Sequence, residues 1–197
     1  MVRAMDPSVA LSLAGPALAV SEEARAELAF DTLYSQHFRG VWRTLRRLGV
    51  AEPHLDDAAQ DVFVIVHRKL PNFDGRAPRS WLYAIAIRVA SDYRRGAAGR
   101  RTIPLSSKIE DGAPGPARLS ELQDRVRLLH ALLDQLDMKK RTVFVLSELE
   151  QLTVPEISEA LGANVNTVYA RLRAARAEFE AALRRHRRRE QRKARVR

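Results

Sequence analysis

Residues 153–179 read TVPEISEALGANVNTVYARLRAARAEF, and this stretch decides the fold of the second half of the chain. Thr153 and Glu156 have the S/T-x-x-E spacing of a capping box, and the proline between them suits a first helical turn, where no backbone N–H is needed. Gly162 supplies the left-handed conformation that ends a helix, and Asn164 can cap the next one. The stretch therefore predicts two helices joined by a tight turn, a helix-turn-helix unit.

The second helix of this unit has an apolar face and a polar face. At about 100° per residue, its apolar face carries Val168, Leu172, Ala175, Phe179 and Leu183. The opposite face begins with short or hydrogen-bonding side chains and Arg, as a helix in the DNA major groove requires. The alternative is a packed helical hairpin whose outer face is only solvated. The pattern favours DNA binding, with these candidate contacts: Asn166, Thr167, Tyr169, Ala170, Arg171, Arg173, Ala174 and Arg176.

The remainder of the 197-residue chain also has helical character. Hydrophobic residues make up 46% of it and aromatic residues only 6%, and alternating β-branched runs are scarce, so we predict an all-α fold. Apolar positions at helical spacing predict helices over 22–48 and from residue 55 to Pro71. Ser80 is expected to cap a third helix. These three helices are predicted to form one compact unit.

A change of composition predicts a second domain. Between residues 96 and 118 the hydrophobic period disappears while Gly and Pro accumulate, as in an extended linker. Helices are then predicted over 122–136, 139–149, 153–161 and 164–183. The expected architecture is two small helical domains joined by a flexible linker, the second containing the helix-turn-helix. The predicted boundaries are 1–21 (disordered N-terminal tail), 22–101 (first domain), 102–118 (linker), 119–183 (second domain) and 184–197 (basic C-terminal tail).

The charge of the chain indicates a polyanionic partner. The formal net charge is +10, and residues 184–197, with eight Arg, one Lys and one Glu, account for +8 of it. This tail is interpreted as a solvated, disordered charge run, with a DNA or RNA contact as the alternative. A second basic cluster lies in and just after the predicted third helix, where Asp92 is the only acidic residue among its members. The cluster consists of Arg88, Arg94, Arg95, Arg100 and Arg101.

Several functional classes are disfavoured. The absence of Cys excludes disulfides and thiolate metal sites, and the histidines lack H-x-x-x-H spacing, so no metal or cofactor is predicted. Asp56, Asp57 and Asp61 could bind magnesium on one helix, but no second carboxylate cluster accompanies them. We therefore predict no enzyme activity and no small-molecule substrate. The apolar stretch from Val9 to Val20 is too short to span a bilayer core of about 30 Å, so a tail is favoured over a signal peptide and no membrane insertion is expected.

Six short motifs resemble one family. In the first domain they are DAAQDVF (57–63), PNFDG (71–75), WLYAIA (81–86) and DYRR (92–95). In the second they are EISEALG (156–162) and TVYARL (167–172). In this order they resemble regions 2 and 4 of the extracytoplasmic function (ECF) group of bacterial RNA polymerase sigma factors, over roughly Phe30 to Arg101 and Leu122 to Leu183.

This resemblance implies a cytoplasmic transcription initiation factor, at the nucleoid when active, that binds core RNA polymerase, directs it to specific promoters and assists strand opening. Core polymerase and promoter DNA are the implied partners, and a cognate anti-sigma factor is a further candidate. Polymerase docking would involve Asp57, Gln60, Asp61 and Arg68. Recognition and melting of the −10 element would involve Phe73, Asp74, Arg76, Tyr83, Arg88, Asp92, Tyr93, Arg94 and Arg95. The helix-turn-helix residues given above, from Asn166 to Arg176, would read the −35 element.

Some positions depart from the family pattern. The family usually has Asn at the position of Arg88, and often Ser and Arg at Ala170 and Ala174, so the promoter sequence does not follow from the resemblance. Trp81 is predicted to belong to the core rather than to the DNA contact. The alternative function is a stand-alone helix-turn-helix regulator, which would need a ligand-binding or dimerisation domain in the first half of the chain.

Overall fold

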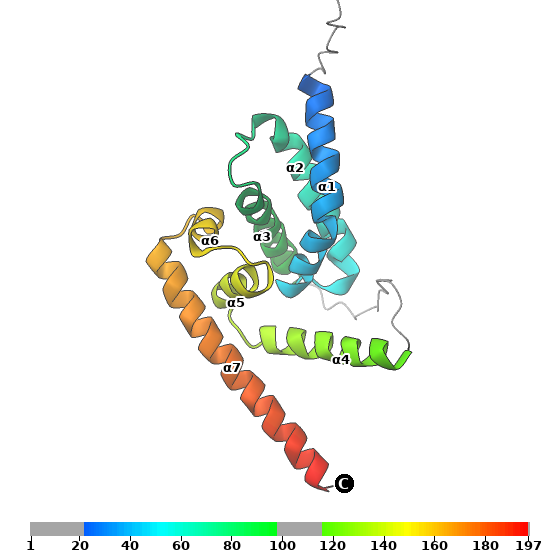
Figure 1. Cartoon of the computed structure of the whole chain (residues 1–197), viewed down its shortest axis with the longest axis vertical. Helices are drawn as coiled ribbons and strands as arrows, with labels where there is room; N and C mark the ends of the chain where they lie inside the picture. The colour runs from blue at the N-terminus through cyan, green and yellow to red at the C-terminus, as the bar shows by residue number, and fades with distance from the viewer. Residues whose placement is uncertain (1–21, 98–115, 197) are drawn as a thin grey trace, which may run out of the picture.

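The computed structural model describes residues 22–97 and 116–196, which form helices and turns without a strand (Figure 1). The all-α prediction is confirmed. The first half contains α1 (Glu22–Arg47), η1 (Glu52–His54), α2 (Leu55–Lys69), η2 (Leu70–Asn72) and α3 (Pro78–Ala97). The second half contains α4 (Pro116–Leu133), α5 (Met138–Phe144), the π-helical segment η3 (Val145–Leu149), α6 (Val154–Leu161) and α7 (Val165–Val196). The predicted N-terminal tail and most of the predicted linker lie outside the described residues.

The ends of the first helices follow from local chemistry. Gly49, just after α1, has a φ of 89°, which favours glycine, and an added Cβ would lie 3.3 Å from Nη1 of Arg141. The prediction that Ser80 caps the third helix is wrong. The helix begins two residues earlier at Pro78, whose fixed φ suits a first helical position. Ser80 is buried inside it, and its hydroxyl has no hydrogen-bond partner in the described part of the chain.

The last helix is longer than the apolar pattern predicted. α7 continues to Val196, so the interpretation of residues 184–197 as a disordered run is wrong for the described part of that segment. Arg, Glu, Gln, Lys and Ala are all good helix formers, and they extend the helix beyond its last packed residue. Pairs along the helix add to this tendency, with Arg184 and Lys193 at 3.3 and 2.9 Å from Glu180 and Glu190.

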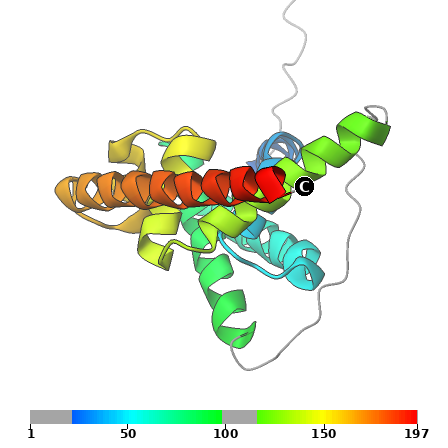
Figure 2. The ribbon, with the colours of Figure 1, turned by 90° about the horizontal axis from the view of Figure 1, so that it is seen from below.

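The larger hydrophobic cluster joins both halves of the molecule. Its centre is formed by buried residues of α1, α2 and α3, such as Leu45, Val62 and Ala86. The same cluster contains residues of the second half: Leu133, Leu136, Phe144, Val145 and Ala175. The two halves therefore pack directly against each other, with α6 beside α3 (Figure 1), while α7 runs across the other helices of the second half (Figure 2).

The smaller cluster forms the core of the helix-turn-helix unit. Leu146, Ile157, Val168 and Leu172 are buried in it, and all four come from the second half. Among the residues whose burial is described, Tyr83 of α3 is the one buried member from the first half. The helix-turn-helix is thus built partly on α3, an arrangement that the sequence analysis did not predict.

A histidine near the junction of the two halves makes stability depend on pH. Burial and the nearby charges of Arg46, Arg141 and Arg47 lower the pKa of His130 from 6.5 to about 4, although Asp134 acts in the opposite direction. The unfolded chain therefore binds a proton at a higher pH than the folded chain does. We expect the free energy of unfolding to fall between pH 6.5 and pH 4, by about 1–2 kcal/mol after allowance for the partial exposure of the ring.

Urea denaturation at a series of pH values measures this effect. The matched variant His130→Gln removes the titrating group and keeps a polar side chain, so its stability should change less over this range. An identical pH profile for the two proteins would show that His130 does not cause the effect.

Candidate nucleic-acid interface

The turn of the helix-turn-helix has the predicted geometry. The Thr153 backbone N–H donates to the Glu156 carboxylate over 2.7 Å, and the Thr153 hydroxyl accepts from the Glu156 backbone N–H, so the capping box is confirmed. The Thr153 backbone N–H most strongly, and then the Thr153 hydroxyl, both of which donate to the Glu156 carboxylate, lower the pKa of that carboxyl. Gly162 follows with a φ of 57°, and the Asn164 side chain accepts from the Asn166 backbone N–H over 2.8 Å. Local side-chain chemistry therefore fixes where α7 begins.

The start of α7 presents the predicted polar face. Val168, Leu172 and Ala175 are buried, whereas Asn166, Ala170, Arg173 and Arg176 are exposed. Thr167, Arg171 and Ala174 are partly buried at the sides of this face, and Tyr169 is 53% exposed. The face is narrow and bears short side chains, so a backbone can approach a DNA groove there.

The two exposed arginines of this face differ in their surroundings. Arg176 donates twice to one carboxylate oxygen of Glu148, over 2.9 and 2.6 Å. Arg173 has no ion pair or side-chain hydrogen bond among the residues that the structure describes. Because its guanidinium is not engaged, Arg173 is the better candidate for a bidentate contact with a guanine.

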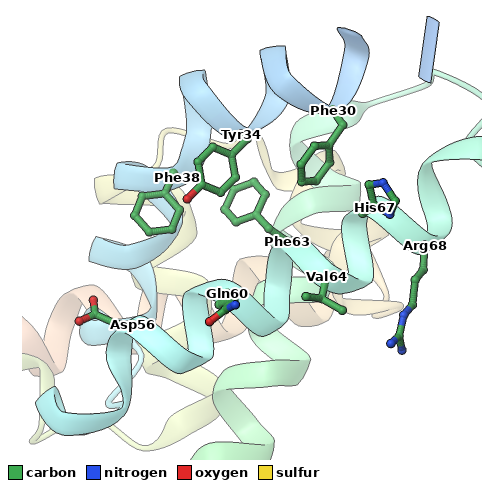
Figure 3. Close-up of a pocket in the computed structure, with 9 residues that line it drawn as sticks. All are labelled: Phe30, Tyr34, Phe38, Asp56, Gln60, Phe63, Val64, His67 and Arg68. Atoms are coloured by element: carbon green, nitrogen blue, oxygen red, sulfur yellow. The ribbon is translucent and has the colours of Figure 1, made fainter. Parts of the chain in front are cut away.

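The polar face of α2 lies beside an aromatic groove. Asp57, Gln60, Asp61 and Arg68, the residues predicted to dock on polymerase, are all exposed on α2. A groove of about 610 Å³ runs between α1 and α2 and includes Gln60 and Arg68 in its lining (Figure 3). Its other lining residues are Phe30, Tyr34, Phe38, Asp56, Phe63, Val64 and His67.

The sequence analysis missed this groove. Phe30, Tyr34 and Phe38 follow one another at intervals of four residues, so they lie on one face of α1, and this spacing could have revealed them. Figure 3 shows their rings facing Phe63 of α2, and the ring centroids of Tyr34 and Phe63 are 4.9 Å apart. With 42% of Tyr34 exposed, the groove combines aromatic surface with a rim of polar side chains.

The acidic residues of α2 are not gathered around a common point. Asp56 accepts a hydrogen bond of 2.8 Å from Nε1 of Trp42, whereas Asp61 accepts one of 2.7 Å from the Tyr93 hydroxyl. Burial and Asp61 together raise the pKa of Tyr93 to about 12. Asp61, predicted to dock on polymerase, and Tyr93, predicted to contact the −10 element, are therefore in direct contact.

The loop before α3 is ordered by its own side chains. Asp74 accepts from the Arg76 backbone N–H over 2.9 Å, and Gly75 adopts a φ of 77°. Phe73 stacks on Trp81 with ring centroids 4.4 Å apart. Trp81, predicted as a core residue, is only partly buried. The loop therefore presents an aromatic pair next to exposed Arg76.

The candidate −10 residues of α3 differ in accessibility. Arg88, Asp92 and Arg95 are exposed, and Arg95 pairs with Asp92. Arg94 is partly buried and contacts the sulfur of Met138 in the second half. Tyr83 is only 6% exposed, so in this arrangement it cannot stack on a base. Its burial and the neighbouring Glu150 raise its pKa above the ordinary value.

Comparison with known families identifies both halves. The Sigma-70 region 2 family matches residues 33–100, and the Sigma-70, region 4 family matches residues 126–179. The RNA polymerase sigma factor NccH of Alcaligenes xylosoxydans xylosoxydans is 30% identical over 184 residues, which cover 90% of this chain and 96% of NccH. The ferric citrate uptake sigma factor FecI of Escherichia coli K12 is 36% identical over 147 residues, covering 73% of this chain and 84% of FecI.

Solved structures show the same arrangement of elements. The structure of CnrH in complex with the cytosolic domain of CnrY has a TM-score of 0.62 and 29% identity, covering 82% of this chain and 94% of CnrH. The sigma factor RpoE of Bartonella quintana, solved in complex with the anti-sigma factor NepR, has a TM-score of 0.63. It is only 16% identical over 79% of this chain and 97% of RpoE, so this second likeness concerns the fold alone.

The two matched regions, in this order, define a transcription initiation factor that binds core RNA polymerase and directs it to promoters. The chain belongs to the ECF group of the sigma-70 family. Region 2 and region 4 below denote residues 33–100 and 126–179. Among the described helices, none is long and apolar enough to cross a membrane.

Proposed function

We propose that the exposed face at the start of α7 reads the −35 element of the promoter. The observation that supports this most strongly is the turn: the capping box and Gly162 fix the start of α7, and Asn166, Ala170 and Arg173 then point away from the core. Short neighbours allow a close approach, and Arg173 is not engaged by a carboxylate of the described chain. The other proposed contacts lie around this face: Thr167, Tyr169, Arg171, Ala174 and Arg176.

We expect Arg173→Ala to weaken binding to a preferred duplex by about 1–3 kcal/mol, since it would remove a bidentate contact with a base. Preferred duplexes can be selected from a random pool with the wild-type protein, and affinities can then be measured by fluorescence anisotropy. Arg184→Ala is the matched control, because Arg184 is an exposed arginine of the same helix outside the proposed contact. An equal loss on preferred and scrambled duplexes would instead assign Arg173 to a phosphate.

We further propose that α2 docks on core polymerase through Asp57, Gln60, Asp61 and Arg68. All four are exposed, and two of them border the aromatic groove. A polar rim around partly buried aromatic rings is the composition of many protein interfaces. The stand-alone regulator is disfavoured because region 2 occupies the place where a ligand-binding or dimerisation domain would be needed.

The loop at 73–76 and the basic side of α3 are proposed to hold the −10 element. The stacked Phe73 and Trp81 offer an aromatic surface beside the exposed guanidinium groups of Arg76 and Arg88, a combination suited to an unstacked strand. The remaining proposed contacts are Asp74, Tyr83, Asp92, Tyr93, Arg94 and Arg95. Tyr83 can take part only if region 4 moves away from it.

The functional division of the chain and its location in the cell are also proposals. We assign residues 22–101 to polymerase docking and strand opening and 119–183 to −35 binding. The predicted linker, 102–118, is too long at its end, because α4 already begins at Pro116. The protein would act by binding alone, without catalysis, in the cytoplasm and at the nucleoid. CnrH, which is 29% identical to this chain, was solved in complex with the cytosolic domain of CnrY, so a cognate anti-sigma factor is a proposed partner of this chain as well.

A further inference from the structure

The last turns of α7 carry arginines that no carboxylate of the described chain holds. Arg184 lies 3.3 Å from Glu180, and Arg185 donates to the Gln135 side chain over 2.9 Å. From residue 187 to residue 195 every side chain is exposed, and Figure 1 shows this end of α7 extending past the other helices. Five arginines of this stretch have no ion pair or side-chain hydrogen bond among the described residues: Arg187, Arg188, Arg189, Arg192 and Arg195.

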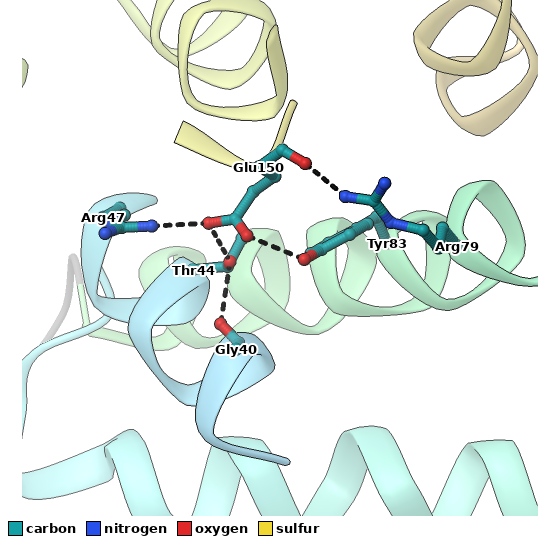
Figure 4. Close-up of polar contacts among 6 residues, drawn as sticks. All are labelled: Gly40, Thr44, Arg47, Arg79, Tyr83 and Glu150. Carbon is teal, nitrogen blue, oxygen red and sulfur yellow. Dashed lines mark hydrogen bonds and ion pairs between the residues drawn. The ribbon is translucent and has the colours of Figure 1, made fainter. Parts of the chain in front are cut away.

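Arginines at the junction of regions 2 and 4 are used differently. Nη1 of Arg47 lies 2.6 Å from a carboxylate oxygen of Glu150, and the Thr44 hydroxyl donates to the same oxygen over 2.7 Å (Figure 4). Arg79 donates to the Glu150 backbone carbonyl. These guanidinium groups are already engaged within the molecule, whereas those at the end of α7 are available to a partner.

Four of the five free arginines lie on one face of α7. At about 100° per residue they fall within an arc of about 120°, and we call them the arginine stripe: Arg188, Arg189, Arg192 and Arg195. Members of the stripe at i,i+3 and i,i+4 carry like charges, which destabilises a helix. The one carboxylate side chain of residues 184–196, Glu190, lies outside this arc and pairs with Lys193 at 2.9 Å. A polyanion alongside the stripe would relieve this repulsion.

The arginine stripe continues the proposed −35 face along the same helix. Three of its members each follow a proposed −35 contact by 18 residues, which is five turns of about 3.6 residues. Arg188, Arg189 and Arg192 follow, in that order, Ala170, Arg171 and Ala174. Side chains separated by whole turns point the same way, so both sets face one side of α7. At 1.5 Å per residue they are about 27 Å apart, which corresponds to about eight base pairs of duplex DNA.

We propose that the arginine stripe binds the phosphates of duplex DNA next to the −35 element, without regard to base sequence. This inference rests on the proposed −35 role of the start of α7. Because the stripe faces the same side as that surface, the phosphates that it meets belong to the same duplex. Arginine contacts with phosphates gain affinity by releasing counterions, whatever the sequence. A straight duplex held at the start of α7 diverges from the helix axis, so the flanking DNA must bend toward the stripe, at a cost that the added contacts offset.

Duplex length isolates the contribution of the stripe. A sequence preferred by the wild type is placed in a duplex of about 12 base pairs and in two longer ones, each extended on one side by about 15 base pairs, which is more than one duplex turn. Fluorescence anisotropy should show that the full chain binds one extended duplex more tightly than the short one. Arg188→Gln/Arg192→Gln should weaken binding to that duplex about tenfold at about 0.1 M salt and lower the slope of log affinity against log salt by about 1.8. Its affinity for the short duplex should stay near the wild-type value.

Arg187→Gln/Lys193→Gln is the matched control. It removes the same charge from the same turns of α7, but both side chains lie outside the arc of the stripe. Glutamine is nearly as good a helix former as arginine and lysine, so neither double variant should shorten α7, which circular dichroism verifies. The control should lose less than about threefold on the extended duplex, because it changes only the overall attraction of the chain for DNA. Equal losses in the two double variants would overturn a contact made by one face of the helix.

Energy transfer between dyes at the two ends of the extended duplex tests the bend. The wild-type protein should increase the transfer, since bending brings the ends closer together. Arg188→Gln/Arg192→Gln should give a smaller increase, and the control should give the wild-type value. The same transfer with all three proteins would overturn the bend toward the stripe.

The outcomes separate the stripe from the −35 proposal. If Arg188→Gln/Arg192→Gln binds the extended duplex as tightly as the wild type, while Arg173→Ala still weakens binding to the preferred sequence, the stripe proposal is overturned and the −35 role stands. If the wild type does not distinguish preferred from scrambled duplexes, the −35 role fails, and the assigned position of the stripe fails with it. A larger loss on single-stranded RNA than on the extended duplex would overturn duplex DNA as the ligand.

Discussion

Asp61→Arg is expected to reduce the affinity for core RNA polymerase by about 2 kcal/mol or more, which is about thirtyfold in the dissociation constant. Asp61 is exposed on the proposed docking face of α2, and a charge reversal would replace attraction by repulsion at an interface selected for complementary charge. Binding to fluorescently labelled core polymerase measures the change. Duplex binding through α7 should be unaffected, because Asp61 belongs to region 2.

Two controls separate docking from structure in this experiment. Asp124→Arg makes the same reversal at an exposed carboxylate of α4, outside the proposed interface, and should leave polymerase affinity near the wild-type value. Tyr93→Phe removes the hydroxyl that bonds Asp61 but keeps the carboxylate. If Tyr93→Phe reproduces the loss, Asp61 acts by positioning Tyr93 and does not contact polymerase itself.

Leu133→Ala should lower the free energy of unfolding by about 2–5 kcal/mol. Leu133 is fully buried in the cluster shared by both halves, and truncation loses the transfer free energy of three carbons and leaves a cavity. Leu122→Ala is the control on the same helix, where the side chain is 50% exposed and the cost should be within about 0.5 kcal/mol. Chemical denaturation followed by circular dichroism measures both.

The number of unfolding transitions in this experiment shows whether the two halves unfold together. Because one hydrophobic cluster contains residues of both halves, Leu133→Ala should shift a single cooperative transition rather than only the part due to region 4. Two separate transitions in the wild-type protein, of which only the second responds to Leu133→Ala, would contradict the shared core.

The elements that could be predicted are those set by local chemistry. The capping box at Thr153 and the left-handed Gly162 each depend on residues within a few positions, so their spacing alone located the helix-turn-helix. The start of α3 was misplaced because a proline, which suits the first helical position, and a serine, which suits a cap, lie two residues apart. Pro78 begins the helix there, and Ser80 is buried within it.

The contact between the halves could not be read from the chain. Glu150 resembles any acidic residue in a connection, and its partner Thr44 is 106 positions away. Tyr83 has the composition of a base-stacking residue, but its burial depends on how region 4 packs, which no local pattern encodes. The aromatic spacing of α1 was visible in the sequence, although only the structure shows that Phe63 completes the groove.

The length of α7 has a mechanical consequence. The same 32-residue helix carries the proposed base contacts at its start and packing residues farther along, where Phe179 stacks on Phe144 with ring centroids 4.6 Å apart. A straight helix moves as one body, so a small tilt at Phe179 would displace the first turns, about 20 Å away, together with Ile157 of α6, which packs with Val168 and Leu172. Substitutions at this aromatic pair can therefore alter promoter choice without touching DNA.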